Sequence, residues 1–545
     1  MAELPTFDRR MSDAEGLMWR LEKDPYLSSA FANVTILDRA PDFDRLLRRM
    51  ERATMLVDRL RQRVQPVPVN LTAPFWVDDP NFDIHYHVRR VALPAPGSMR
   101  QLVELASLIA CDPFERTRPL WQFVVVEGLR GGRAALIQKM HHTIADGETS
   151  VKMSLEFLDF ERDAPEPAPI DRATIERPDD ATTAMANQDL LRDLVAGGLR
   201  FPLGLLRQIK ELLADPTGIP EAGNAAADTI RGVLNQLGDT ESAASPLWTK
   251  RSLQRRIEVL RAPFGDTRVA AKHLGGTLNT AFITAAAEAA GRYHRELGSP
   301  VDHLRASMAV STRTDSSGSN AFSLARMMVP TGDMPIADRF RAIQAAADAA
   351  KETTTGSSLE TLATVAATLP TSLVTRLARQ QAQTVDFATS NVRGAPIPLY
   401  IAGAEVLANH PVGPLGGVAF NLTLLSYNHS LDMGVNIDRA AVTEPELLRT
   451  CLEGAFDDLL AVPHETAAPA KRPAAKPTTT KRPTKPTTTK PTTTKPTTTK
   501  PTTTKPTATK PTATKPTATK RPTKSATTQP PAERPPSPGT TNAAP

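Results

Sequence analysis

Two apolar runs joined by a pair of glycines constrain the fold of this chain more than any other stretch. The runs are Gln122–Glu127 and Arg133–Met140, and Gly131-Gly132 lies between them. β-rich runs joined by a Gly-containing loop predict a hairpin. The second strand then leaves its sheet at His141-His142. Because side chains alternate along a strand, one histidine would point into a cleft and the other away from it.

The segment that follows the hairpin allows two interpretations. His141-His142-Thr143-Ile144-Ala145-Asp146-Gly147 can belong to a catalytic site, because histidine is the side chain that titrates near neutral pH. It can equally be two partly buried histidines at a strand end, with Asp146 capping a helix that begins near Glu148. The residues alone leave both interpretations open.

Several common site chemistries fit this segment poorly. Two His and an Asp are candidate metal ligands, but adjacent histidines on a strand diverge and no His-Glu-x-x-His pattern or Cys/His cluster accompanies them. We therefore expect no metal. The chain also lacks a Gly-x-Ser-x-Gly elbow and a Gly-rich phosphate loop. What remains is a histidine acting as general base on a hydroxyl or amine, a role worth roughly 10²–10⁴-fold in rate.

The charge of the chain is divided between a body and a tail. Of its 65 basic and 59 acidic residues, sixteen basic and two acidic residues lie from Glu465 onward, which leaves a net charge of −8 before that point. Pro-Thr-Thr-Thr-Lys and Pro-Thr-Ala-Thr-Lys repeat from Lys476 to Lys520. Without large apolar residues such a segment cannot offset its conformational entropy, so we expect it to be disordered. Its widely spaced lysines predict weak, salt-sensitive polyanion binding or a solubilising role.

Three further features bear on the cellular location. Cys111 and Cys451 are the only cysteines, which fits a reducing compartment. The N-terminal residues contain acidic side chains and no apolar core of a signal peptide. No apolar run approaches the roughly 20 residues of a membrane-spanning helix. We expect a cytoplasmic protein that meets a membrane only at its surface.

Strands and helices alternate in two bodies, which predicts an α/β or α+β class. We expect an N-terminal domain at residues 1–161, a linker with amphipathic helices at 162–245, a C-terminal domain at 246–464 and a disordered tail at 465–545. Asp189–Leu213, in the linker, is basic and amphipathic, and it can pack between the domains or lie on a bilayer.

The expected elements follow from apolar periodicity and capping residues. The predicted helices are Ser12 to about Lys23, Asp42–Gln62, Met99–Ile109, Ser150–Phe160, Thr277–Tyr293 and Ala337–Lys351. The predicted strands outside the hairpin are Ala32–Leu37, Phe82–Val88, Arg255–Leu260, Leu304–Val310 and the region Phe420–Met433. In Phe82–Val88 the alternation places His85 and His87 on one face.

The histidine segment resembles the His-His-x-x-x-Asp-Gly signature of acyl-CoA-dependent acyltransferases, and the wider chain resembles the bacterial wax ester synthase/diacylglycerol acyltransferases. The resemblance covers residues 10–462. The stretches that carry it are Ser12–Glu15, Pro74-Phe75-Trp76, Phe82-Asp83, His87-Val88-Arg89, Leu93-Pro94, Pro96-Gly97, Arg118-Pro119-Leu120-Trp121, Ser311-Thr312-Arg313, Ser319-Asn320, Ser390-Asn391-Val392 and Gly416 through Leu422 to Ser426-Tyr427.

This resemblance implies a fold and a set of roles. The fold would have two chloramphenicol-acetyltransferase-like domains, each a mixed sheet with flanking helices, and an active-site channel between them. His142 would be the general base, His141 would shape the pocket, and Asp146 would order the loop. Gly147 would allow close backbone packing. The implied substrate-binding residues are Gly147, Pro119, Leu120, Trp121, Asn279, Ser390 and Asn391. Acyl-CoA would be a co-substrate, with no further cofactor.

The chain departs from the family pattern at two places. Asn279-Thr280 stands where the family usually has Asn-Asp, and Arg393-Gly394-Ala395 follows Ser390-Asn391-Val392 where Pro-Gly-Pro is common. Arg393 would place a positive charge near the CoA or the interdomain surface, or it is an exposed loop residue.

Two functions follow as hypotheses. The first is transfer of an acyl group from acyl-CoA to diacylglycerol, to a fatty alcohol or to another lipid alcohol, on the inner membrane face or a lipid droplet. The second is a catalytically weak coat or tether on lipid droplets that binds polyanions through its tail. The intact histidine signature favours the first, and the sequence does not set chain length or acceptor.

Overall fold

A computed structural model describes residues 8–66, 73–145, 147–168, 170, 243–311, 322–354, 363, 366, 369 and 371–462. All of them lie in one compact unit, Met1–Thr466. The amphipathic stretch Asp189–Leu213 and the repeat tail lie outside these residues, so the predictions for both remain predictions.

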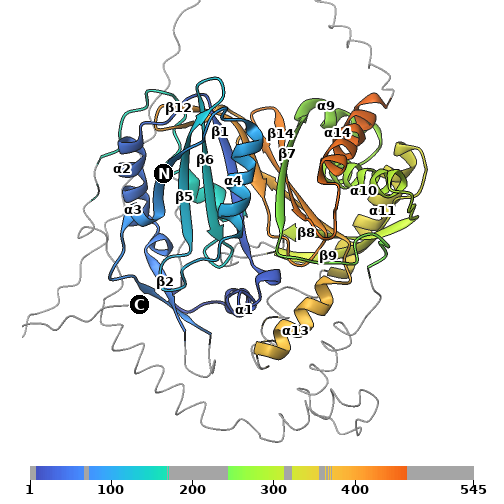
Figure 1. The fold of residues 1–545 in the computed structure, drawn as a ribbon, viewed down its shortest axis with the longest axis horizontal. Helices are drawn as coiled ribbons and strands as arrows, with labels where there is room; N and C mark the ends of the chain where they lie inside the picture. Colours follow the sequence, from blue (N-terminus) through green and yellow to red (C-terminus); the bar gives the residue numbers. More distant parts are fainter. Residues whose placement is uncertain are drawn as a thin grey trace, which may run out of the picture. The chain divides into compact units, whose positions relative to one another are not determined.

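The predicted hairpin forms the middle of a six-stranded sheet. Strands β5 (Trp121–Leu129) and β6 (Arg133–His141) are antiparallel neighbours, and β1 (Ala30–Leu37) pairs with the other side of β6. The complete order is β11-β12-β1-β6-β5-β4, with β4 (Val88–Ala92), β11 (Tyr400–Ile401) and β12 (Ala404–Val412) (Figure 1). Gly131 and Gly132 both have positive φ, at 84° and 73°, which explains why glycines make this turn.

Helices cover both faces of this sheet. The capping box predicted at Ser12 and Glu15 is present and opens α1 (Asp13–Leu21). Helix α2 begins after Asp42 but ends at Leu56, earlier than predicted, because Val57 is extended and a 3₁₀ turn, η2 (Asp58–Leu60), leads into a small hairpin. The remaining elements of this half are η1 (Pro25–Leu27), α2 (Phe43–Leu56), β2 (Gln62–Gln65), β3 (Phe75–Asp78), α3 (Ile84–His87), α4 (Met99–Cys111) and α5 (Gly147–Ser154).

A second six-stranded sheet has the order β7-β14-β13-β10-β8-β9. Its strands are β7 (Arg255–Pro263), β8 (His303–Ser311), β9 (Phe322–Pro330), β10 (Phe387–Arg393), β13 (Phe420–Tyr427) and β14 (Ser430–Asp438). The predicted strand region Phe420–Met433 is in fact a hairpin. It turns at Asn428 and His429, which have positive φ, so no glycine marks the turn in the sequence.

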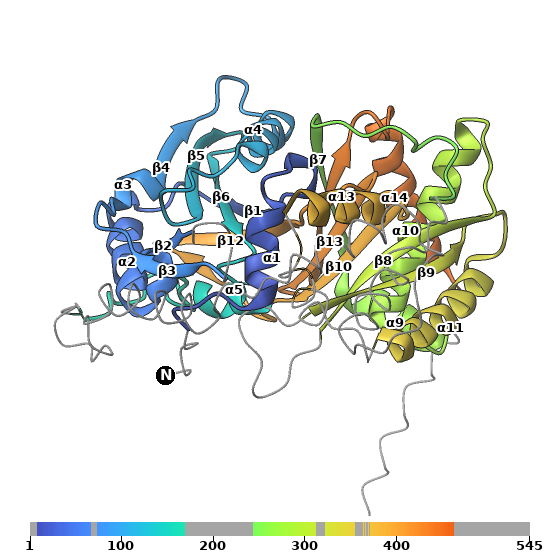
Figure 2. The ribbon, with the colours of Figure 1, turned by 90° about the horizontal axis from the view of Figure 1, so that it is seen from below.

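One apolar helix forms the core of this half. Helix α10 (Leu278–Glu296) is buried almost all round, which its run of alanines permits, because small side chains let neighbouring elements approach closely. It packs against α9 (Phe264–His273), α11 (Ile336–Thr354) and α14 (Pro445–Ala461) on one side of the sheet (Figure 1). Helix α13 (Thr371–Ala382) instead packs against α1 (Figure 2). Two mixed sheets with flanking helices confirm the predicted fold class.

The second half of the chain contributes strands β11 and β12 to the first sheet. Strand β12 follows β10 along the chain but pairs with β1, so residues 1–161 do not build the first sheet alone. It also packs against β13 and β14 of the second sheet. The domain boundaries predicted at 161, 245 and 464 therefore stay predictions, and the sheets cross the boundaries at β11 and β12.

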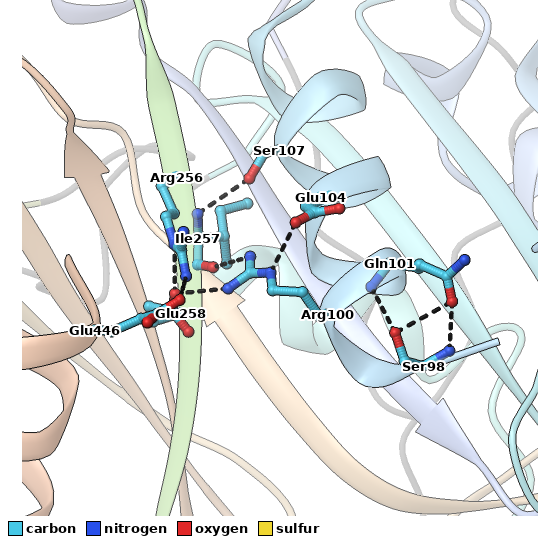
Figure 3. A network of polar contacts seen from close by, with 9 residues as sticks. All are labelled: Ser98, Arg100, Gln101, Glu104, Ser107, Arg256, Ile257, Glu258 and Glu446. Carbon is cyan, nitrogen blue, oxygen red and sulfur yellow. Dashed lines mark hydrogen bonds and ion pairs between the residues drawn. The ribbon is translucent and has the colours of Figure 1, made fainter. Parts of the chain in front are cut away.

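A second contact between the halves covers the edge of β7. Arg100 of α4 donates to the Ile257 carbonyl at 3.0 Å and pairs with Glu258 at 2.6 Å, and Ser107 accepts from the Ile257 N–H at 3.0 Å (Figure 3). The unpaired backbone groups of an edge strand attract other chains unless something covers them. Helix α4 thus satisfies the β7 edge and joins the two halves.

The predicted strand Phe82–Val88 is wrong over most of its length. The Asp83 side chain accepts from the His85 N–H at 2.9 Å and caps the short helix α3, which local capping favours over the alternating pattern. The two histidines do not share a face: His85 is exposed, whereas His87 is fully buried.

We expect buried His87 to make the fold sensitive to acid. It stacks on Trp121 and donates from Nδ1 to the Trp121 carbonyl at 2.7 Å, and burial lowers its pKa to about 4. Since the unfolded pKa is about 6.5, the unfolded state takes up the proton first, and stability is lost as pH falls from 6.5 to 4. The loss is about 3 kcal/mol.

Urea unfolding at pH 7 and pH 4 measures this effect. The free energy of unfolding of the wild type should fall by about 3 kcal/mol more than that of His87→Asn, whose amide keeps a donor for Trp121. His85→Asn, at the exposed neighbouring histidine, should retain the wild-type loss. Equal losses in wild type and His87→Asn would contradict the assignment.

Candidate active site

A cavity of about 1130 Å³ is lined by strands of both sheets. It exceeds the roughly 300–1,000 Å³ of ordinary small-molecule sites. Most of its walls are apolar, and α1 and α13 contribute Leu17, Met18, Leu21, Val374, Leu377 and Ala378. The cavity has room for a long-chain ligand.

The histidine pair diverges as the strand geometry predicts. His142 lines the cavity and is half-buried, and its ring lies 4.6 Å from the Phe31 ring. Its backbone N–H donates to the Ser29 carbonyl at 3.2 Å. His141 is buried and does not line the cavity. The expectation of one histidine in a cleft and one away from it is confirmed.

Hydrogen bonds hold His141 in one tautomer. The Thr143 N–H donates to Nδ1 at 3.1 Å, so Nε2 carries the proton and donates to Glu22 at 2.9 Å. Burial alone would raise the pKa of Glu22. Hydrogen bonds from His141, Ser28 and Ser29 outweigh burial and lower the pKa of Glu22 to about 2. This carboxylate is ionised at every physiological pH.

The rest of the signature is described in part. Asp146 lies outside the described residues. Gly147 is the first residue of α5, close to the predicted helix start, and α5 ends at Ser154 rather than continuing to Phe160. Because Ser150 and its successors on α5 line the cavity, the signature leads directly into one cavity wall. The roles of Asp146 and Gly147 stay predictions.

The Pro119-Leu120-Trp121 element lies behind the histidines. All three residues are buried, and none of them lines the cavity. The Leu120 carbonyl accepts from the His141 N–H at 3.0 Å, and the Trp121 indole donates to the Leu60 carbonyl at 2.8 Å. The element thus anchors the end of β6. The predicted contact of these three residues with substrate stays a prediction. Their position away from the cavity does not support it.

The second half brings Asn279, Ser390 and Asn391 together. Ser390 and Asn391 line the cavity, and the Asn391 amide donates to Asn279 Oδ1 at 3.3 Å. Asn279 itself stands behind them, with its amide 3.2 Å from the Met308 sulfur. Thr280, at the position where the family usually has Asp, is buried and donates to Gln344 at 2.5 Å. It therefore faces α11 and not the cavity.

Cationic side chains reach the cavity from three elements. They are Lys152 on α5, Arg326 on β9 and Arg393 at the end of β10. Arg326 donates to Gln381 of α13 at 2.5 Å. Arg393 is exposed and also lines the cavity, so both interpretations of its role stay predictions.

Sequence reasoning missed Glu22, Ser29 and Phe31, which surround the histidine pair. No motif in the sequence marks them. Within the described residues, no group of His, Cys, Asp and Glu has an arrangement that could hold a metal ion. None of the described helices has both the length and the apolar character needed to cross a bilayer.

Two family models match the chain. The wax ester synthase/diacylglycerol acyltransferase catalytic domain matches residues 11–282, and the C-terminal domain of the same family matches residues 318–460. A Mycobacterium tuberculosis H37Rv protein, provisionally named a diacylglycerol O-acyltransferase, is 32% identical over 475 residues. The match covers 84% of this chain and 93% of that protein. A second protein of that strain with the same provisional name is 30% identical, covering 85% and 99%.

Solved structures share the fold. The wax ester synthase/diacylglycerol acyltransferase from Marinobacter aquaeolei VT8 matches with a TM-score of 0.57 at 21% identity, over 83% of this chain and 98% of that chain. A trichothecene 15-O-acetyltransferase from Fusarium sporotrichioides matches with a TM-score of 0.54 at 10% identity, covering 84% and 99%.

Proposed function

This chain belongs to the wax ester synthase/diacylglycerol acyltransferase family, and from that premise we propose that it is an O-acyltransferase. Its acyl donor is acyl-CoA and its preferred acceptor is diacylglycerol, so its product is triacylglycerol. The observation that carries the proposal is the placement of His142 on the wall of a large, mostly apolar cavity.

The chemistry requires one proton shuttle and no acyl-enzyme. His142 accepts the proton of the acceptor hydroxyl while the hydroxyl oxygen attacks the thioester carbonyl carbon. The tetrahedral intermediate then collapses, the C–S bond breaks, and the imidazolium returns the proton to the CoA thiolate. The products are an ester and free CoA. General base catalysis of this kind contributes about 10²–10⁴-fold.

The cavity supports both substrates. Its volume and apolar walls suit acyl chains. Arg393 and Lys152 give the walls positive charge, which suits the phosphates of CoA, because guanidinium and ammonium groups bind phosphate oxygens. Diacylglycerol is favoured as acceptor because the mycobacterial relatives carry that name. Fatty alcohols and other lipid alcohols are the alternatives.

The experiment follows labelled acyl-CoA into lipid. Purified full-length protein is incubated with labelled acyl-CoA and diacylglycerol, a fatty alcohol or no acceptor, and labelled triacylglycerol and wax ester are separated. We expect triacylglycerol to dominate. A dominant wax ester would reassign the acceptor. Absence of transfer to every alcohol would overturn the enzyme and favour a coat or tether on lipid droplets.

We further propose that the protein works on the inner membrane face or on lipid droplets, where its substrates dissolve, and that the Lys-rich tail adds weak polyanion binding. Flotation with neutral and anionic vesicles at low and high salt measures both. A chain ending at Val462 should float with neutral vesicles as the full chain does, and it should lose the salt-sensitive gain on anionic vesicles. Identical flotation of the two chains on anionic vesicles would contradict the role of the tail.

A further inference from the structure

Glu22 directly follows helix α1 and is its C-cap residue. It lies beside the histidine pair, before the turn that leads into β1. Its Oε1 accepts from the Ser28 hydroxyl at 2.7 Å. Its Oε2 accepts from the Ser29 N–H at 2.8 Å and from His141 Nε2 at 2.9 Å. One carboxylate therefore joins two segments that are more than a hundred residues apart in the sequence, with a separation of 119 between Glu22 and His141.

These partners adjoin the backbone that carries His142. The Ser29 carbonyl accepts from the His142 N–H at 3.2 Å, and Ala30 pairs with His141 in the β1–β6 ladder. The Phe31 ring, one residue further along β1, packs on the His142 ring. Glu22 thus restrains both sides of the position from which His142 projects: the turn before β1 and the end of β6.

The environment of Glu22 makes these bonds costly to lose. Its side chain is only 14% exposed, and a buried charge is tolerated only where hydrogen bonds or opposite charges compensate it. The positive charges of Arg116 and Lys139 also interact with the Glu22 carboxylate. Glu22 does not line the cavity, so it cannot exchange a proton with a substrate there.

We propose that Glu22 is a positioning residue for acyl transfer, which fixes the His141 tautomer and the Ser28-Ser29 turn and thereby directs His142 into the cavity. The inference rests on the proposed function, because the reaction at His142 gives the positioning its purpose. A misplacement of about 1 Å in a catalytic group can lower the rate about 10²-fold. Loss of the hydrogen bonds of Glu22 would allow His142 to move by such a distance and would lower the rate.

Glu22→Gln tests the role with little change in size. The amide can keep all three partners only if its N–H₂ group turns to Ser28 Oγ, which then has to accept, and it replaces the charged acceptor of His141 and Ser29 by a neutral one that forms a weaker hydrogen bond. We expect kcat to fall about 10- to 100-fold, while KM for acyl-CoA and for diacylglycerol stays within about threefold. The double variant with His141→Gln should lose no more than the larger single loss, because residues of one network are not additive.

Glu15→Gln is the matched control. Glu15 is a buried glutamate of the same helix, but its carboxylate serves the capping box, where glutamine also functions. Its kcat should stay at the wild-type value even if its unfolding midpoint falls. An equal loss of kcat in Glu15→Gln and Glu22→Gln, or multiplicative losses in the double variant, would overturn the inference.

The proposed function and the positioning role of Glu22 can fail independently. A wild type without turnover on any alcohol contradicts the proposed function, and NMR of ¹⁵N-histidine-labelled protein then decides the positioning role. The wild type should show His141 protonated at Nε2, and Glu22→Gln should shift the Nε2 resonance of His141, because a neutral acceptor replaces the carboxylate. An unchanged His141 spectrum in Glu22→Gln would overturn the inference whatever the turnover. An active wild type with undiminished kcat in Glu22→Gln would overturn it directly.

Discussion

Replacement of His142 by alanine should lower acyl transfer by about 10²–10⁴-fold, which is what a general base contributes. His142 is the histidine of the pair that lines the cavity, and no histidine from the second sheet lines that cavity among the described residues. Alanine leaves no group at this position that can accept the hydroxyl proton. The measurement is the initial rate of labelled triacylglycerol formation at saturating acyl-CoA.

The control for this prediction is a histidine remote from the cavity. His303 is exposed at the start of β8, and His303→Ala should keep the wild-type rate. Circular dichroism and the urea midpoint of His142→Ala should match the wild type, because a half-buried cavity residue supports little packing. Turnover of His142→Ala within threefold of wild type would refute the base assignment.

Gly434→Ala should produce a large loss of stability. A Cβ at Gly434 would lie 2.1 Å from the Pro411 carbonyl oxygen, across the contact between β14 and β12. Backbone at this distance has to move, and overpacking a tight interior costs about 1–3 kcal/mol, occasionally more. Because Pro411 and Val412 line the cavity, we expect the acyl transfer rate to fall as well.

Gly265→Ala is the control for this substitution. It lies on α9, and no heavy atom comes within 4 Å of an added Cβ. Its free energy of unfolding, measured by urea unfolding, should stay within about 0.5 kcal/mol of wild type, the usual range for open surface sites. Equal urea midpoints for Gly434→Ala and Gly265→Ala would contradict the prediction, because they would show that β12 and β14 can move apart without loss of stability.

The sequence predicts those parts of the site that local rules govern. The hairpin, the strand end at His141 and the divergence of the two histidines follow from apolar runs, glycines and strand alternation. The capping box at Ser12 is equally local. The strand predicted at Phe82–Val88 failed for a local reason too, since one capping aspartate, Asp83, redirected the backbone into a short helix.

Long-range pairing is what the sequence could not supply. Nothing in the residues of β12 indicates that they pair with β1, because an alternating strand pattern specifies a buried face and not a neighbour. The same limit hid Glu22, whose partners come from a distant strand end. For the same reason the sequence did not show that Asn391 lies next to Asn279. The two residues come close because β10 pairs with β8 and β13 in a particular register.

The pairing of β12 with β1 has a consequence for synthesis of the chain. Thr35 of β1 pairs with Asn409 of β12, 374 residues further along. At about 5–20 residues per second, the ribosome needs roughly 20–75 s to produce that partner. Throughout this interval β1 is an open edge in the nascent chain, and open edges recruit other strands. The first sheet of this chain can therefore be completed only after most of the second half has been synthesised.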